Sequence, residues 1–219
     1  MGLLSIDGEI RVAIAALHSS DPAVNPFLRE FHAALQRKTA VVAEQRCPKI
    51  NDALAFFDKV AKQGEANCLM VVTHGYDDGR PNYEETKADP RQGDILVENW
   101  RFLAMGMRKA AQDKLVILAV CFAGADAIAE TLMKTAPGAF ALAVLAPAPG
   151  CKLYVDPGAK AIAMFLDRLA ALNLNSYEEE HLRDAETRVG QVYKGTLKLW
   201  FFGDVPGEDW LTDTEPDAN

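Results

Sequence analysis

The chain has 219 residues, of which 49% are hydrophobic and 25% charged, with a formal net charge of −8 at pH 7. This composition is typical of a globular protein rather than of a disordered or a membrane protein. An acidic surface repels phosphate backbones and anionic lipids, so we expect neither nucleic acid nor a membrane as a partner.

Short apolar runs alternate with amphipathic stretches along the chain. The apolar runs predict strands, which are Ile10–Leu17, Thr39–Glu44, Asn67–Thr73, Lys114–Val120, Phe140–Ala146 and Thr196–Phe202. The stretches between them predict helices, which are Pro26–Lys38, Asn51–Gln63, Asp94 to about Gln112, about Gly124–Thr135, about Gly158–Leu172, and one from Ser176. Asn25 is the expected N-cap of the first helix, and Ser176 and Glu179 match a capping box at the start of the last one.

The alternation of strands and helices predicts the fold class. Strands separated by helices at this spacing form a parallel sheet covered on both faces. We therefore expect an α/β protein, a three-layer sandwich with a mostly parallel six-stranded sheet and helices on both faces. Residues 1–206 are predicted to form one domain, and residues 207–219 an acidic C-terminal tail.

The cysteines and the N-terminus bear on the compartment. Cys47, Cys68, Cys121 and Cys151 form no C-x-x-C pair, and no Cys/His cluster has zinc spacing. The first residues lack the basic segment and long apolar core of a signal peptide. We expect a reduced, cytoplasmic protein with no metal and no other cofactor.

Polar residues follow three of the predicted strands. His18 and Asp21 come after the first strand, His74 and Gly75 after the third, and Cys121 after the fourth. In such sheets ligands bind beyond the carboxyl ends of the strands. These residues are therefore the candidates for a functional site.

The pair His74 and Cys121 has the chemistry of a nucleophilic site. A deprotonated thiol is a strong nucleophile, and a nearby imidazole can protonate a leaving group. If the third and fourth strands are neighbours, both side chains can reach one substrate carbonyl. The backbone N–H groups of Gly75 and Cys121 could then form an oxyanion hole.

Two interpretations stay open for the flanking residues. His18 could line a substrate pocket or replace His74 as the base, or it could be a plain loop residue. Asp77 could orient His74 or bind a basic substrate side chain, or it could belong to a solvated turn. Cys47, Cys68 and Cys151 are interpreted as structural, because free cysteines are among the most buried residues.

The two motifs resemble the caspase-like clan of cysteine peptidases, which includes caspases, metacaspases and legumains. An apolar strand ends in His-Gly (CLMVVTHG, Cys68 to Gly75), and a second ends in a cysteine (KLVILAVCFAG, Lys114 to Gly124). His74 and Cys121 are 47 residues apart, near the roughly 50 of caspases. The C-x-x-G run is similar to metacaspases, legumains and bacterial caspase-like domains.

This resemblance implies a caspase-hemoglobinase-like fold and a cysteine endopeptidase. Cys121 would be the nucleophile, His74 the general acid/base, and Gly75 with Cys121 the oxyanion hole. It also implies a protein or peptide substrate and an activating partner protein. Metacaspases carry an acidic residue two positions before the cysteine, where this chain has Ala119, so their preference for Arg or Lys is not carried over.

Two other classes of function remain as alternatives. The first is a binding or scaffold module with the same fold and no peptidase activity. The second is a different α/β enzyme, against which the chain has neither a G-x-S-x-G elbow nor a G-x-G-x-x-G after the first strand.

Overall fold

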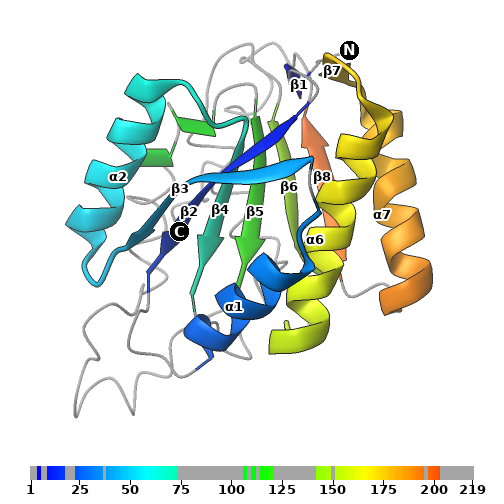
Figure 1. Ribbon diagram of the computed structural model, residues 1–219, viewed down its shortest axis with the longest axis horizontal. Helices are drawn as coiled ribbons and strands as arrows, with labels where there is room; N and C mark the ends of the chain where they lie inside the picture. The colour runs from blue at the N-terminus through cyan, green and yellow to red at the C-terminus, as the bar shows by residue number, and fades with distance from the viewer. Residues whose placement is uncertain are drawn as a thin grey trace, which may run out of the picture.

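The computed structural model describes residues 4–5, 9–17, 23–36, 38–73, 106–107, 110–111, 114–120, 142–148, 151–194 and 197–202. A six-stranded sheet lies at its centre (Figure 1). Its strands are β2 (Ile10–Ala16), β3 (Thr39–Arg46), β4 (Cys68–Val72), β5 (Lys114–Ala119), β6 (Leu142–Pro147) and β8 (Leu197–Phe202).

The strand order is β3-β2-β4-β5-β6-β8. Every neighbouring pair is parallel except β6 and β8, which run antiparallel. The predicted α/β class and mostly parallel six-stranded sheet are therefore confirmed. Each apolar run of the sequence became a strand within one or two residues of its predicted limits.

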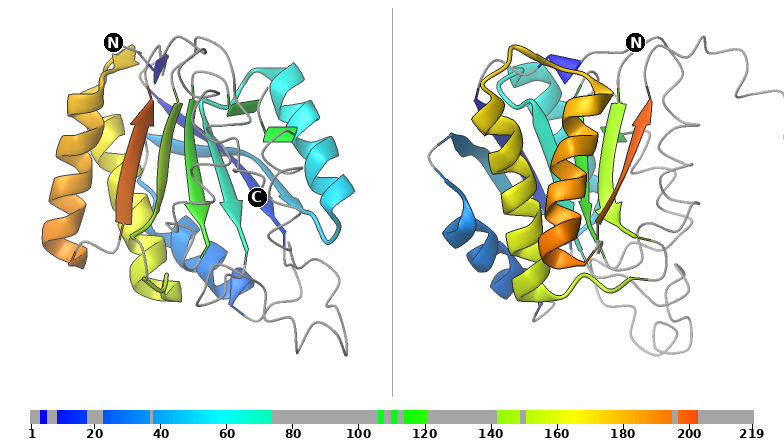
Figure 2. Two further views of the ribbon diagram at one scale, coloured as in Figure 1. Left: turned by 180° about the vertical axis from the view of Figure 1, so that it is seen from behind. Right: turned by 90° about the vertical axis from the view of Figure 1, so that its right-hand side faces the viewer.

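Helices cover both faces of this sheet. On one face lie α1 (Val24–Ala34), α6 (Val155–Leu172) and α7 (Glu179–Tyr193), which Figure 2 shows side by side. On the other face lie α2 (Ile50–Gln63) and the short helical pieces at 106–107 and 110–111. The predicted cover on both faces is confirmed, and the arrangement is compatible with a three-layer sandwich.

The strands are continuous apolar runs because both faces of the sheet are buried. All five residues of β4 are buried. Successive side chains point to opposite faces, so Met70 and Val72 pack in the core beneath α1 and α6, while Leu69 and Val71 pack in the core beneath α2. The sheet thus separates two hydrophobic cores.

The start of α1 differs from its prediction. The helix begins at Val24 after Ala23, with no side-chain cap, so Asn25 is not the N-cap. Val24 is buried in the core, and the N–H of Phe27 donates to the Ala23 carbonyl at 3.0 Å. Burial of Val24 therefore starts the helix earlier, and Pro26 remains in the first turn, where its missing N–H costs no helical hydrogen bond.

The start of α7 also corrects a prediction, because Ser176 does not cap it. Ser176 and Tyr177 form a short strand, β7 (Ser176–Tyr177), which pairs antiparallel with β1 (Leu4–Ser5). Tyr177 is fully buried and its hydroxyl donates to the Leu169 carbonyl at 2.7 Å. The helix then begins at Glu179, and the Glu178 N–H donates to Nδ1 of His181 at 3.1 Å.

Several predicted segments lie outside the described residues. They are the helix at 124–135, most of the helix at 94–112, and the acidic tail at 207–219. Among the helices that the structure describes, none has the length and apolar character needed to cross a membrane.

Candidate functional site

The carboxyl ends of β2, β4 and β5 lie next to one another. Ala16 is matched with Val72, and Val72 with Ala119. Beyond these residues the N–H of Leu17 donates to the Val72 carbonyl at 2.9 Å, and the N–H of Thr73 donates to the Ala119 carbonyl at 3.4 Å. The hydrogen-bond ladder therefore holds the three strand ends in one fixed register.

The direction of winding reverses at this place in the sheet. From β2 the chain adds β3 on one side, then crosses over to add β4, β5 and β6 in turn on the other. In open α/β sheets, ligands bind in the crevice outside the carboxyl ends of the strands at such a reversal. The switch point between β2 and β4 is therefore where the fold by itself favours a binding site.

The predicted site residues follow directly from these strand ends. His18, His74 and Cys121 are each the second residue after one of the matched residues, namely Ala16, Val72 and Ala119. These three residues, together with Asp21, Gly75 and Asp77, lie outside the described residues. The structure thus describes the strands from which the candidate site departs, up to Leu17, Thr73 and Val120.

We expect Thr39→Val to lower the free energy of unfolding by about 1 kcal/mol, because the buried Thr39 hydroxyl donates to Oδ1 of Asp167 at 3.1 Å and valine removes this hydrogen bond. Chemical denaturation at pH 7 measures the change. An unchanged or higher free energy of unfolding would contradict this account.

The other cysteines have environments that suit a structural role. Burial raises the pKa of the fully buried Cys68 thiol. Burial, and next the Asp52 carboxylate, raises the pKa of the Cys47 thiol to about 11, although a side-chain hydrogen bond with Gln45 opposes the shift. Both thiols stay protonated at neutral pH. Cys151 is partly exposed.

One polar pair of the structure carries no signal in the sequence. Nε2 of His32 lies 2.7 Å from Oε2 of Glu44. Together they border a shallow groove of about 590 Å³ between the end of α1 and β3. This groove lies beside the edge strand rather than at the carboxyl ends of β2, β4 and β5. No pattern could have revealed the pair, because the two residues meet only when α1 packs beside β3.

No cluster of three or more His, Cys, Asp or Glu side chains suited to a metal ion occurs in the described ranges. Comparisons of the chain with protein-family models, with curated proteins and with solved structures give no match. The resemblance to caspase-like peptidases therefore depends on the His74-Gly75 and Cys121 motifs and on their positions relative to the strands.

Proposed function

We propose that this chain is a cysteine endopeptidase of the caspase-like type, with Cys121 as nucleophile and His74 as general acid/base. The observation that carries the proposal is the pairing of β4 with β5, in register up to Val72 and Ala119. His74 and Cys121 follow these residues at equal distance along the chain. Neighbouring strands are about 4.8 Å apart, a spacing that lets two side chains serve one carbonyl group.

The proposed reaction begins with attack of the Cys121 thiolate on the carbonyl carbon of the scissile peptide. The resulting oxyanion accepts hydrogen bonds from the N–H groups of Gly75 and Cys121. His74 protonates the leaving amine, and the C–N bond breaks to give a thioester. Water, deprotonated by His74, then attacks the thioester, releases the acid product and restores the Cys121 thiolate beside the protonated His74.

The substrate would extend from Cys121 past His74 toward the end of β2. Since Ala16 of β2 is matched with Val72 on the side of β4 away from β5, His18 and Asp21 are suited to a substrate pocket there. Asp77 is proposed as a further pocket residue. An activating partner protein remains part of this proposal.

The test is labelling of the thiols at neutral pH by an acyloxymethyl-ketone probe, followed by mass spectrometry. The parent protein should carry Cys151→Ser, which removes the partly exposed competing thiol among the described cysteines. Cys47 and Cys68 should label slowly because both are buried and their pKa values are raised. We expect labelling at Cys121 at least tenfold faster than at either, and a loss of that advantage in His74→Ala.

The control is iodoacetamide labelling after denaturation, which should reach all remaining thiols at similar rates. Equal, slow labelling of Cys121, Cys47 and Cys68 in the folded protein would reject the proposed nucleophile. A binding or scaffold role without peptidase activity would then be the better explanation of what this chain does.

A further inference from the structure

The two edges of the central sheet are protected in different ways. An edge strand presents unpaired N–H and C=O groups, which attract strands of other chains. At one edge, β3 has a register shift opposite Val12 and Ala13, and Glu44 and Arg46 are exposed near its end. Bulges and charges are common defences of an edge. At the other edge, α7 lies alongside β8 (Figures 1 and 2).

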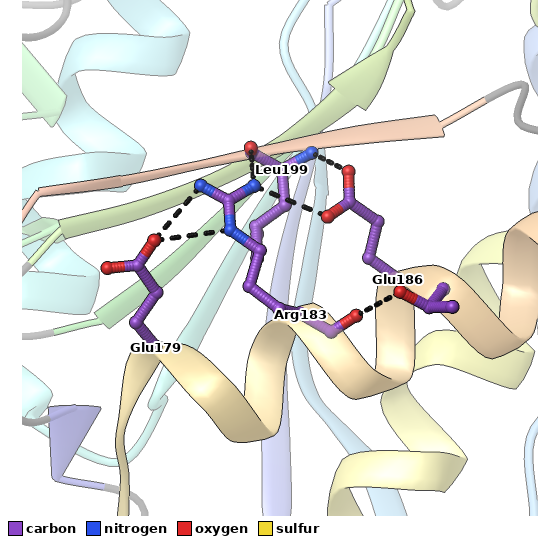
Figure 3. Close-up of polar contacts among 5 residues, drawn as sticks. Glu179, Arg183, Glu186 and Leu199 are labelled. Atoms are coloured by element: carbon purple, nitrogen blue, oxygen red, sulfur yellow. Dashed lines mark hydrogen bonds and ion pairs between the residues drawn. The ribbon is translucent and has the colours of Figure 1, made fainter.

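Two side chains of α7 reach the backbone of Leu199 in β8 (Figure 3). Nη1 of Arg183 donates to the Leu199 carbonyl at 2.5 Å, and the Leu199 N–H donates to Oε1 of Glu186 at 2.8 Å. On the opposite side of β8 from these contacts, Leu199 is matched with Leu145 of β6. Both backbone groups of Leu199 are thus satisfied from the α7 side by side chains.

The guanidinium of Arg183 is held in position by its own helix. Its Nε and Nη2 donate to Oε1 of Glu179 at 3.2 and 3.1 Å, and its Nη1 also donates to Oε2 of Glu186 at 3.3 Å (Figure 3). Glu179 and Glu186 lie one turn before and one turn after Arg183. These hydrogen bonds within α7 hold the guanidinium of Arg183 in one orientation. Less side-chain conformational entropy is therefore lost when it binds the Leu199 carbonyl.

The contacts reproduce what a neighbouring strand would provide. In an antiparallel ladder, a residue on the next strand offers one N–H donor and one C=O acceptor. Here the guanidinium supplies the donor and the carboxylate supplies the acceptor, and both are charged, so the hydrogen bonds are stronger than backbone ones. Leu199 itself is 1% exposed.

We propose that Arg183 and Glu186 take the place of one residue of a seventh strand and close the β8 edge against pairing with a second copy of this chain. The proposal is independent of any peptidase activity. It predicts that removal of the two side chains frees the N–H and C=O of Leu199, which lies within β8 with residues of the strand on both sides. Two copies would then pair edge to edge through β8 in antiparallel fashion.

The test compares the unaltered chain with Arg183→Ala/Glu186→Ala by sedimentation velocity over a range of concentrations. We expect the variant to associate at a concentration at least tenfold lower than the unaltered chain. Hydrogen exchange should also show at least tenfold faster exchange of the Leu199 amide in dilute variant protein, because its carboxylate acceptor is absent.

Two controls separate this effect from general damage to α7. Asp184→Ala/Arg188→Ala removes an exposed ion pair of the same helix, 2.7 Å between Nε and Oδ2, and should leave association unchanged. Glu186→Gln keeps an oxygen acceptor for the Leu199 N–H, so the β8 edge of this variant should also remain closed to pairing. If the double alanine variant does not fold, as judged by far-UV circular dichroism, Glu186→Ala replaces it.

Unchanged association of the opened variant, or equal association of the Asp184/Arg188 control, would overturn the proposal. The same holds if the Leu199 amide exchanges at the same rate in the unaltered chain and in dilute Arg183→Ala/Glu186→Ala protein.

Discussion

Cys121→Ala is expected to lower kcat/KM for peptide hydrolysis at least about a thousandfold, because alanine offers no nucleophile to form the thioester. A mixture of internally quenched peptides covering every residue before the scissile bond provides the assay. The Cys151→Ser variant serves as the control and should keep full activity. If Cys121→Ala retains more than a tenth of the activity, another group performs the attack and the proposed mechanism is wrong.

The losses of rate on removing His74 and Cys121 should not be additive. His74→Ala alone is expected to remove most of the rate, since the leaving amine then departs without a proton donor. The variant lacking both side chains should be scarcely slower than Cys121→Ala, because residues that act in one step give non-additive losses. Additive losses would instead indicate that His74 contributes to binding or folding rather than to the same chemical step.

The sheet could be predicted from the sequence because each strand is buried on both faces. Runs such as Leu69–Val72 and Leu115–Ala119 are apolar throughout, and only a sheet with cover on both sides hides every residue of a strand. Such runs mark both the strand and its end, where polar residues begin. That is why the ends of the third and fourth predicted strands could be located just before His74 and Cys121, and the pairing of β4 with β5 meets the condition that these two strands be neighbours.

The helix starts were harder to predict, because long-range packing determined them. A local rule selected Asn25 as a cap, but burial of Val24 placed the start before it. A local rule selected Ser176, but pairing with β1 and burial of Tyr177 drew that segment into a strand. Capping rules consider only a few residues of sequence, whereas these contacts join segments far apart in the chain.

The polar contacts of the sheet edge were beyond prediction for the same reason. Arg183 and Glu186 occur as two charged residues in a helix, and nothing near them in sequence identifies Leu199 as their partner. Glu179, in the acidic first turn of this helix, likewise forms an ion pair with Arg183, 3.1 Å between Oε1 and Nη2. The antiparallel direction of β8, which brings its edge beside α7, also carries no local signal.

One buried side chain links the strands at the opposite end from the candidate site. Asn67 is 5% exposed. Its Oδ1 accepts the Arg11 N–H at 2.8 Å, and its Nδ2 donates to the Glu9 carbonyl at 2.8 Å. Its backbone also donates to the Arg11 carbonyl at 3.0 Å and accepts the Leu115 N–H at 3.3 Å. Asn67 therefore connects the starts of β2, β4 and β5.

We expect Asn67→Ala to lower the free energy of unfolding by about 2 kcal/mol, since the Asn67 side chain loses its two part-buried hydrogen bonds to the Arg11 N–H and the Glu9 carbonyl. Urea denaturation at pH 7 measures the loss. Asn25→Ala makes the same chemical change at an exposed position of α1 and should alter stability by less than about 0.5 kcal/mol. A loss below about 1 kcal/mol for Asn67→Ala would mean that water replaces the side chain.

The same variant separates folding from chemistry at the candidate site. The register runs unbroken from Cys68 and Leu115 to Val72 and Ala119, and the remaining ladder bonds and both cores still specify it in the absence of the Asn67 side chain. Folded Asn67→Ala protein, kept below its unfolding transition, should therefore label at Cys121 as fast as the unaltered chain. Slower labelling in the folded variant would show instead that this side chain determines how β4 and β5 present their carboxyl ends.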